Sequence, residues 1–201
     1  MTEERRISQK QFVGRVNEEI SDNYEDIKLL GQGAYSIVIL AKQRPTGILR
    51  CVKKIAKKNF TKAENENIMN EIKVLKEVDH PNVINIVEYY ESLNSLYIVT
   101  EYLDGGELFD KIEQKSCFGE NEARKIMMQI LSAVSYLHNL GFIHRDLKPE
   151  NIIFEKLDKD NLNLKIIDFG TSRKIVKDEI LTVRMGTPYY IAPEVLKKNY
   201  N

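Results

Sequence analysis

Eight consecutive residues carry the strongest signal in this sequence: His144-Arg145-Asp146-Leu147-Lys148-Pro149-Glu150-Asn151. They follow a segment with helical periodicity and precede a short apolar strand, so they are predicted to form a loop. Functional side chains concentrate on such loops. Asp146 can accept a hydroxyl proton, Lys148 can stabilise negative charge on a transferring group, and Asn151 offers an amide oxygen to a hard cation. The alternative is a polar turn without a catalytic role.

A second string stands downstream, directly after a predicted strand over residues 164–167. Asp168-Phe169-Gly170 places a carboxylate at the end of that strand, where it suits Mg²⁺. As a lone tripeptide this string is weak, and it gains weight because it follows the 144–151 loop. The segment that it opens closes with Gly186-Thr187-Pro188-Tyr189-Tyr190-Ile191-Ala192-Pro193-Glu194, for which a proline-rich turn is the alternative.

Upstream of the loop the chain is predicted to be rich in strands from Tyr24 onward. Apolar runs bounded by turn residues predict strands over 27–30, 37–41, 48–55, 83–90 and 96–102. A helix with an apolar stripe at Ile68, Ile72 and Leu75 interrupts them, and Thr61 and Glu64 have the spacing of its capping box. After Gly105-Gly106 helices are predicted over 107–113 and about 120–139, with a further strand over 152–154. The predicted fold class is therefore α+β, with a strand-rich lobe, a hinge and a helical lobe.

The string Gly31-Gln32-Gly33-Ala34-Tyr35-Ser36-Ile37-Val38 joins the first two predicted strands. Glycines let backbone N–H groups approach phosphate oxygens without a side chain in the way. A plain hairpin is the alternative. The position between two strands, rather than between a strand and a helix, argues against a Rossmann fingerprint or a Walker loop.

A lysine and a glutamate explain one another in the strand-rich part. In the string Arg50-Cys51-Val52-Lys53-Lys54-Ile55, Lys53 shares a strand face with Cys51 and Ile55 and needs a partner for its charge. Glu71 lies beside the apolar helix stripe, where a lone carboxylate is costly. A surface lysine and a snorkelling glutamate are the alternatives; a Lys53–Glu71 pair that directs the ammonium at phosphates satisfies both.

These five strings, in their order along the chain and with the Lys53–Glu71 pair, resemble the eukaryotic protein kinase family from Tyr24 to Asn201. The strings around Phe12-Val13-Gly14 and Gly105-Gly106-Glu107-Leu108-Phe109 are most similar to its calcium- and calmodulin-dependent group. The resemblance implies the two-lobe kinase fold. Its expected parts are an N-terminal extension over 1–23, an N-lobe with hinge over 24–104 and a partial C-lobe over 105–201.

The resemblance implies that Mg-ATP donates its γ-phosphoryl group to protein Ser or Thr hydroxyls. Asp146 is then the catalytic base, with Lys148, Lys53 and Glu71 as further catalytic residues, and Asn151 and Asp168 hold Mg²⁺. Thr100 becomes the gatekeeper, and the backbone of Glu101 and Leu103 pairs with adenine. The full set implied to contact the nucleotide is Leu30, Gly31, Gly33, Val38, Cys51, Lys53, Thr100, Glu101, Leu103, Glu107, Asn151, Ile153 and Asp168.

The sequence departs from the family pattern in three places. Ser36 replaces the third glycine of the loop, and Cys51 stands where alanine is usual. Family domains continue past the residue that matches Glu194, through helices that supply its arginine partner, whereas this chain stops seven residues later. We therefore expect a truncated domain, and a kinase-like protein that binds nucleotide or partners without transferring phosphate is the alternative.

Composition limits the partners. The 30 basic and 30 acidic residues cancel, so no overall field attracts nucleic acid or a membrane surface, and no apolar run is long enough to span a membrane. Two cysteines fit a reducing cytosolic or nuclear compartment. Glu107 and Glu150 suggest a protein substrate with basic residues before the target hydroxyl, and Arg145 suggests a phosphate pocket for Thr182. Calcium control is expected only through segments or partners outside this chain, because the residues after Asp158-Lys159-Asp160 do not complete a calcium loop.

Overall fold

The computed structural model describes residues 13–16, 18–33, 36–57, 62–115, 117–158, 161–176 and 179–201, with the backbone alone for residues 13 and 62–67. The chain divides into an N-terminal unit, residues 1–65 with 85–102, and a C-terminal unit, residues 66–84 with 103–201. Several sequence predictions fall outside the described residues or side chains: Phe12, Ala34-Tyr35, the capping box at Thr61 and Glu64, and Lys159-Asp160.

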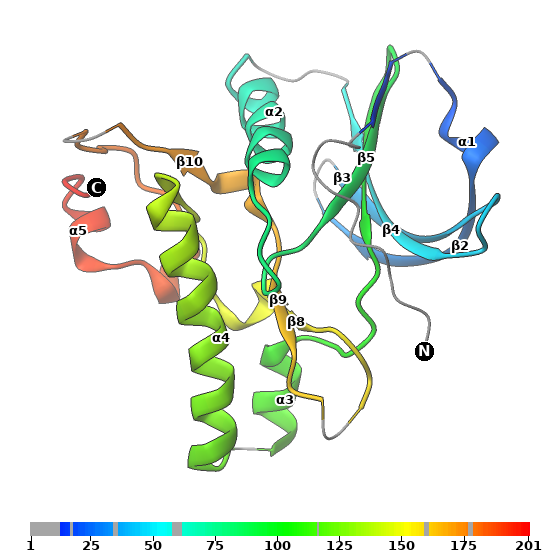
Figure 1. Ribbon diagram of the computed structural model, residues 1–201. Coiled ribbons are helices and arrows are strands. Elements are labelled where there is room, and N and C mark those ends of the chain that lie inside the picture. Colours follow the sequence, from blue (N-terminus) through cyan, green and yellow to red (C-terminus); the bar gives the residue numbers. More distant parts are fainter. Residues whose placement is uncertain are drawn as a thin grey trace. The chain divides into compact units, whose positions relative to one another are not determined.

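The N-terminal unit is built on a six-stranded sheet with the order β1-β5-β6-β4-β3-β2 (Figure 1). The pairing of β1 with β5 is parallel and every other pairing is antiparallel. The short helix α1 leads into β2. The elements are β1 Val13–Val16, α1 Ile20–Asn23, β2 Tyr24–Gln32, β3 Ser36–Gln43, β4 Leu49–Ala56, β5 Ile86–Glu91 and β6 Ser95–Glu101. The predicted strands therefore form, and β1 is an addition within the stretch expected as an extension.

The register of this sheet sorts its side chains onto two faces, because successive residues of a strand point to opposite sides. Val52 of β4 lies opposite Ile39 of β3 and Val99 of β6. Val52 and Val99 belong to the buried core of this face, which contains Tyr24, Ala41, Val52, Tyr90 and Val99. The residues that alternate with them, including Cys51 and Lys53, lie on the other face.

The bounds of several strands differ from the predicted ones, and the start of β5 differs for a long-range reason. A continuous strand was expected over 83–90, but β5 begins at Ile86. The backbone N–H of Ile84 donates instead to the carbonyl of Ile166, and Val83 forms an isolated bridge with the same residue. Residues 83 and 84 therefore pair with a strand of the C-terminal unit and do not extend β5. Local periodicity cannot predict this long-range pairing.

The C-terminal unit consists of helices and short strands. The longer helices are α2 Lys62–Glu77, which enters this unit at Glu66, α3 Leu108–Lys115 and α4 Glu120–Asn139. Two-stranded pairings join β7 Phe142–Ile143 to β10 Arg173–Lys174 and β8 Ile152–Phe154 to β9 Leu164–Ile166. Single helical turns complete it: η2 Pro149–Asn151, η3 Phe169–Thr171, η4 Pro188–Tyr190 and α5 Pro193–Leu196.

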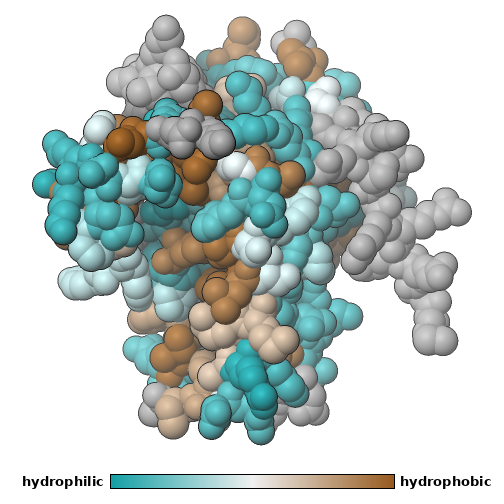
Figure 2. All heavy atoms as spheres, turned by 60° about the vertical axis from the view of Figure 1, so that its left-hand side comes forward, coloured by the Kyte–Doolittle hydropathy of each residue, from teal (hydrophilic) through white to brown (hydrophobic). Residues whose placement is uncertain are grey.

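Helix α4 begins and ends where the sequence predicted, and it has two apolar stripes. Ile126, Ala133 and Leu137 are buried. Met127, Met128 and Leu131 are 48%, 65% and 59% exposed. Figure 2, which turns the side of α4 and α5 toward the reader, shows hydrophobic side chains gathered in a band among polar ones.

The segment after Asp168 is anchored at several points of the C-terminal unit. Leu181 is buried and exchanges both backbone hydrogen bonds with Tyr200. The Tyr200 hydroxyl donates to the carbonyl of Val183 at 2.6 Å. Thr182 itself is exposed on this anchored stretch. Among the described helices, none is both long and apolar enough to cross a membrane.

Candidate functional site

The predicted site residues of the N-terminal unit lie on one face of its sheet. Val38 of β3 is opposite Lys53 of β4, and Cys51 of β4 is opposite Thr100 of β6. Because residues two apart on a strand share a face, Cys51 and Lys53 point to the same side. The ladder therefore places Val38, Cys51, Lys53 and Thr100 together, opposite the face that carries the buried core around Val52 and Val99.

The Cys51 thiol is kept protonated by its surroundings. Burial raises its pKa, and the hydrogen bond with Thr100 and the charge of Lys53 offset only part of that effect. A protonated thiol is a small apolar group rather than a nucleophile. Cys51 therefore acts here as part of an apolar wall next to the Lys53 ammonium.

The glycine string leaves room at the end of β2. Gly31 lies opposite Val38, and a Cβ at Gly31 would meet no atom within 4 Å. The turn is closed by the N–H of Gly33, which donates to the carbonyl of Ser36 at 2.7 Å. Leu30, just before the string, is 39% exposed. An open backbone at this turn is what a close-approaching ligand would need.

The residues predicted to follow the gatekeeper are split between the two units. Glu101 ends β6, and its side chain accepts a hydrogen bond at 2.8 Å from the backbone N–H of Asn85. Leu103 belongs to the C-terminal unit, as does Glu71. The adenine contacts implied for Glu101 and Leu103, and the Lys53–Glu71 pair, therefore remain predictions.

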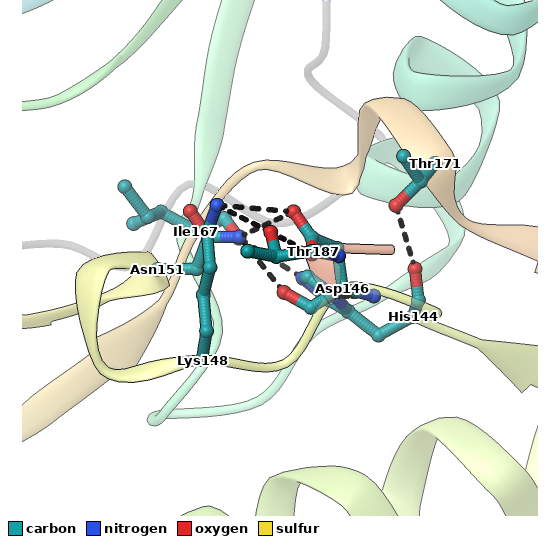
Figure 3. Close-up of polar contacts among 7 residues, drawn as sticks. All are labelled: His144, Asp146, Lys148, Asn151, Ile167, Thr171 and Thr187. Carbon is teal, nitrogen blue, oxygen red and sulfur yellow. Dashed lines mark hydrogen bonds and ion pairs between the residues drawn. The ribbon is translucent and has the colours of Figure 1, made fainter. Parts of the chain in front are cut away.

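In the C-terminal unit the predicted catalytic loop forms a closed network around Asp146 (Figure 3). Asp146 Oδ1 accepts hydrogen bonds from both the backbone N–H and the hydroxyl of Thr187, at 2.8 and 2.7 Å. Lys148 Nζ donates to Thr187 Oγ1 at 2.8 Å and lies 3.4 Å from Asp146 Oδ2. Asn151 Nδ2 donates to the Asp146 carbonyl at 2.8 Å and contacts Oδ2 at 3.3 Å.

These contacts decide the ionisation of Asp146. Burial by itself would raise the pKa of this carboxyl group, but hydrogen bonds from Thr187 and the charge of Lys148 outweigh it and hold the pKa below its usual range. Asp146 is therefore an ionised proton acceptor at neutral pH.

The backbone around the network is strained at two positions. Arg145 and Asp168 have φ values of 69° and 58°, a region that non-glycine residues rarely adopt. Arg145 Nε donates to the carbonyl of Thr171 at 2.5 Å, and Thr171 Oγ1 donates to the carbonyl of His144 at 3.0 Å. Strain of about 1–3 kcal/mol at such residues persists only where the surroundings enforce it, and it concentrates at functional sites.

His144 connects the loop to the strand that precedes Asp168. Its Nε2 lies 3.0 Å from the Ile167 carbonyl, and its Nδ1 accepts from the N–H of Asp146 at 3.3 Å. Together these contacts require the neutral tautomer with the proton on Nε2. Burial lowers the pKa of His144, and the hydrogen bond to Ile167 only partly opposes this. The Phe169 ring packs edge-on against it at 4.9 Å between centroids.

The two predicted magnesium ligands are neighbours across the β8–β9 pairing. The N–H of Ile167, the residue before Asp168, donates to the backbone carbonyl of Asn151 at 2.9 Å. Asp168 then turns into η3, where a Cβ on Gly170 would lie 3.3 Å from Asp168 Oδ1 and 3.6 Å from Glu71 Oε2. The structure thus brings Asn151 and Asp168 together and places Glu71 beside Gly170.

An acidic group surrounds the end of the hinge segment. Glu107 forms an isolated bridge with Ile153, which fixes both predicted nucleotide contacts in the C-terminal unit. Burial raises the pKa of Glu107, and the charges of Asp110 and Glu150 raise it further. Among the described atoms, Glu150 Oε2 is buried without a hydrogen-bond partner. The arrangement is suited to a cation that would neutralise these carboxylates.

Thr187 is the functional candidate that sequence reasoning did not assign. It was quoted only as part of the string 186–194, and its role comes from folding the segment back onto the loop. The close approach is permitted by Gly186, which has a φ of 109°, and whose Cβ, if present, would lie 2.7 Å from the Arg145 carbonyl. The sequence signal that could have indicated this role is the glycine directly before a hydroxyl residue in that string.

The comparisons agree with this geometry. The family described as "Protein kinase domain" matches residues 24–201, and the chain belongs to that family. Calcium-dependent protein kinase 4 of Plasmodium berghei (strain Anka) is 39% identical over 191 residues, covering 94% of this chain and 36% of the relative. The same values hold for calcium-dependent protein kinase 4 of Plasmodium falciparum (isolate 3D7).

A further relative is more similar in sequence over a slightly shorter stretch. Calcium-dependent protein kinase 5 of Plasmodium falciparum (isolate 3D7) is 46% identical over 186 residues, covering 92% of this chain and 32% of the relative. The chain spans about a third of the length of these curated relatives. The mixed α+β fold and the kinase resemblance expected from the sequence are thereby confirmed.

Proposed function

We propose that the protein is an ATP-dependent serine/threonine kinase that transfers a phosphoryl group to protein hydroxyls. The observation that carries the proposal is the Asp146 network. An ionised carboxylate is held by a lysine, an asparagine and a threonine on a loop, within a chain that belongs to the protein kinase family. Phosphoryl transfer needs mainly positioning and charge stabilisation, which such a preorganised network supplies.

Each residue of the network has a distinct task in this proposal. Asp146 accepts the proton of the substrate hydroxyl, since its carboxylate remains ionised. Lys148 contacts both Asp146 and Thr187, so its ammonium is held where negative charge develops. Thr187 keeps Oδ1 of Asp146 in one orientation and leaves Oδ2 on the side of Asn151 and Lys148.

The residues present fit Mg²⁺ in chemistry and placement. Mg²⁺ takes one or two protein oxygen ligands together with phosphate oxygens and water. Asn151 donates from its Nδ2 to Asp146, so in this proposal its amide carbonyl oxygen would be the atom that binds the ion. Asp168 follows the residue that is hydrogen-bonded to Asn151. With ATP the ion would supply neutralisation of phosphate charge.

The N-terminal unit would hold the nucleotide with the sheet face that carries Lys53. Val38, Cys51 and Thr100 give that face a small apolar surface, and Lys53 provides a cation beside it. The open backbone at Gly31 allows N–H groups to approach phosphate oxygens. Leu30, Gly33, Glu101 and Leu103 complete the proposed contacts.

The test compares phosphotransfer by the wild-type chain with Lys53→Met and Asp146→Asn, using radiolabelled Mg-ATP and a basic peptide. Transfer by wild type alone supports the proposal. A melt with Mg-ATP at about 100 times its dissociation constant is run in parallel, and a shift of roughly 5–10 °C is expected. A shift without transfer would support the alternative of a nucleotide-binding, non-transferring protein. The absence of both a shift and transfer would refute the kinase proposal and this alternative.

The substrate preference rests on the acidic group. We expect Glu107→Gln to raise the KM for a peptide with arginine before the target serine by roughly tenfold, because one partner of the substrate cation is lost. The KM for a matched neutral peptide should change little. Glu113→Gln on exposed α3 is the control. Equal changes for both peptides would contradict recognition of basic residues by Glu107.

A further inference from the structure

The N-terminal unit extends beyond the part of the chain that matches the kinase family. The match begins at Tyr24, whereas β1 lies over Val13–Val16 and pairs in parallel with β5. The register runs from Val13 opposite Glu88 to Val16 opposite Glu91. Strand β1 therefore covers a sheet edge that β5 would otherwise present with unpaired backbone groups.

Glu88 of β5 is a buried charge within the core face of the sheet. It lies opposite Val99 and is 6% exposed. One carboxylate oxygen accepts a hydrogen bond from the Tyr24 hydroxyl. The other accepts from Arg15 Nε of β1 at 2.8 Å. A buried carboxylate is costly unless it is hydrogen-bonded and neutralised.

Of these two partners only Arg15 brings a positive charge. Burial and the hydrogen bond to Glu88 raise the pKa of Tyr24, so its hydroxyl stays neutral. Arg15 also contacts Glu18 at 2.8 Å, and its guanidinium lies 5.7 Å from the Tyr90 ring centroid. Through this one charged side chain, Arg15 ties the segment that precedes Tyr24 to the core of the unit.

Apart from Arg15, the described residues of strand β1 add little apolar side chain to hold it, although the Tyr89 ring lies against Gly14. The strand has four residues, of which Gly14 has no side chain and Val16 is 56% exposed. It lies at the end of the sheet and pairs with one neighbour only. A strand with so little buried apolar surface depends on its backbone ladder and on the Arg15–Glu88 ion pair.

We propose that Arg15 and Glu88 form a latch that holds the described residues 13–16 and 18–23 as a strap on the N-terminal unit, with Arg15 as a positioning residue for the nucleotide face. The route is short. Glu88 is opposite Val99, the neighbour of Thr100 on β6, and Val99 is opposite Val52, the neighbour of Lys53 on β4. Opening the latch would remove the directly bonded cation of Glu88, on the core face of the sheet whose other face carries Lys53 and Thr100.

The test uses the full chain with Arg15→Met, Arg15→Lys and the control Lys174→Met, whose ion pair with Glu77 spans 2.6 Å between half-exposed side chains of the C-terminal unit. Arg15→Met should lower the melting temperature by about 4–8 °C, and Arg15→Lys by less. Lys174→Met should lower it by under about 2 °C. Hydrogen exchange of the β5 amides should accelerate roughly tenfold or more in Arg15→Met only.

A double variant separates neutralisation of Glu88 from loss of packing. In Arg15→Met/Glu88→Gln no charge remains to be compensated, so the added effect of Arg15→Met should shrink to that of the control. An effect of Arg15→Met no larger than the control would overturn the latch, and so would an undiminished effect in the Glu88→Gln background. The Mg-ATP melting shift should fall in Arg15→Met and return in the double variant. The melting and hydrogen-exchange measurements without nucleotide test the Arg15–Glu88 latch independently of the proposed kinase function.

Discussion

The candidate site residues of the N-terminal unit and those of the C-terminal unit are positioned by different means. In the N-terminal unit, Val38, Cys51, Lys53 and Thr100 are aligned by a backbone ladder, and none of them needs the others to keep its place. In the C-terminal unit, Asp146 is positioned by side chains on loops, mainly Thr187, Lys148 and Asn151. A side-chain substitution in the N-terminal unit should therefore have a local effect. A substitution around Asp146 should also disturb the other residues of that network.

The largest effect is expected at Gly186. Gly186→Ala would place a Cβ 2.7 Å from the backbone carbonyl of Arg145, at a φ of 109°. We expect a loss of about 2–4 kcal/mol in unfolding free energy, because neither backbone can yield cheaply. Gly106→Ala is the matched control, since Gly106 has a φ of 78° but open space around it. It should lose only about 1 kcal/mol, and equal losses in urea titrations would refute the role of the close contact.

A substitution of Thr187 tests whether the loss of one side chain disturbs the whole network around Asp146. Thr187→Val removes the hydroxyl that links Lys148 to Asp146, while the backbone N–H contact remains. We expect kcat to fall by roughly 10–100-fold with little change in the KM for ATP, because the base loses its orientation. Thr187→Ser keeps the hydroxyl and should retain most of the activity. A serine variant as slow as the valine variant would show that the methyl group, not the hydrogen bonds, matters.

The neutral state of His144 predicts a pH dependence of stability. Its folded pKa lies below the ordinary value near 6.5, so the unfolded chain binds more protons below that pH. Stability should therefore decrease as pH falls through about 6.5 toward 5, with a slope of at most about 1.4 kcal/mol per pH unit from this residue. The partly buried His80 adds to the wild-type slope with the same sign, because burial also lowers its pKa.

The measurement is the slope of unfolding free energy between pH 7 and 5.5 in the wild type and in His144→Phe. The variant should have a smaller slope whatever its absolute stability, and a substitution at exposed His138, His138→Gln, serves as the matched control. An unchanged slope in His144→Phe would mean that this histidine is not forced to remain neutral.

The smallest effect is expected at Cys51, in the half held by the ladder. Cys51→Ala removes a protonated thiol from the wall beside Lys53 but leaves the pairing of β4 with β3 and β6 in place. We expect a loss of about 1 kcal/mol in stability and a change of less than about twofold in the KM for ATP. A fall in kcat for Cys51→Ala as large as the one expected for Thr187→Val would remove the contrast between the residues of the two units.

Much of the fold was predictable because its signals are local. Helix α4 over Glu120–Asn139 and strand β8 over Ile152–Phe154 have the predicted bounds. Periodicity and breaker residues suffice for such elements, since burial of one face dominates their energetics. The contacts that could not be predicted are long-range. Val83 and Ile84 pair with Ile166, and β1 pairs with β5, because tertiary partners override the local pattern.

The candidate site divides in the same way. Asp146, Lys148, Asn151 and Asp168 could be proposed from the sequence, since their order along the chain and their residue types resemble the family to which the chain belongs. Thr187 could not be assigned a role, because its contact with Asp146 depends on how the segment returns over the loop. The same holds for Arg15, whose partner Glu88 is far along the chain.

The sequence by itself determined the class of fold, the succession of elements and the residues proposed for phosphoryl transfer, because each depends on residue type and on short-range pattern. The tertiary structure alone decided which charges meet. It pairs Arg15 with Glu88, surrounds Asp146 with Thr187 and Lys148, and raises the pKa of Glu107 through burial and then through its acidic neighbours. Electrostatic free energies depend on distance and burial, and both arise only when segments remote in sequence pack together.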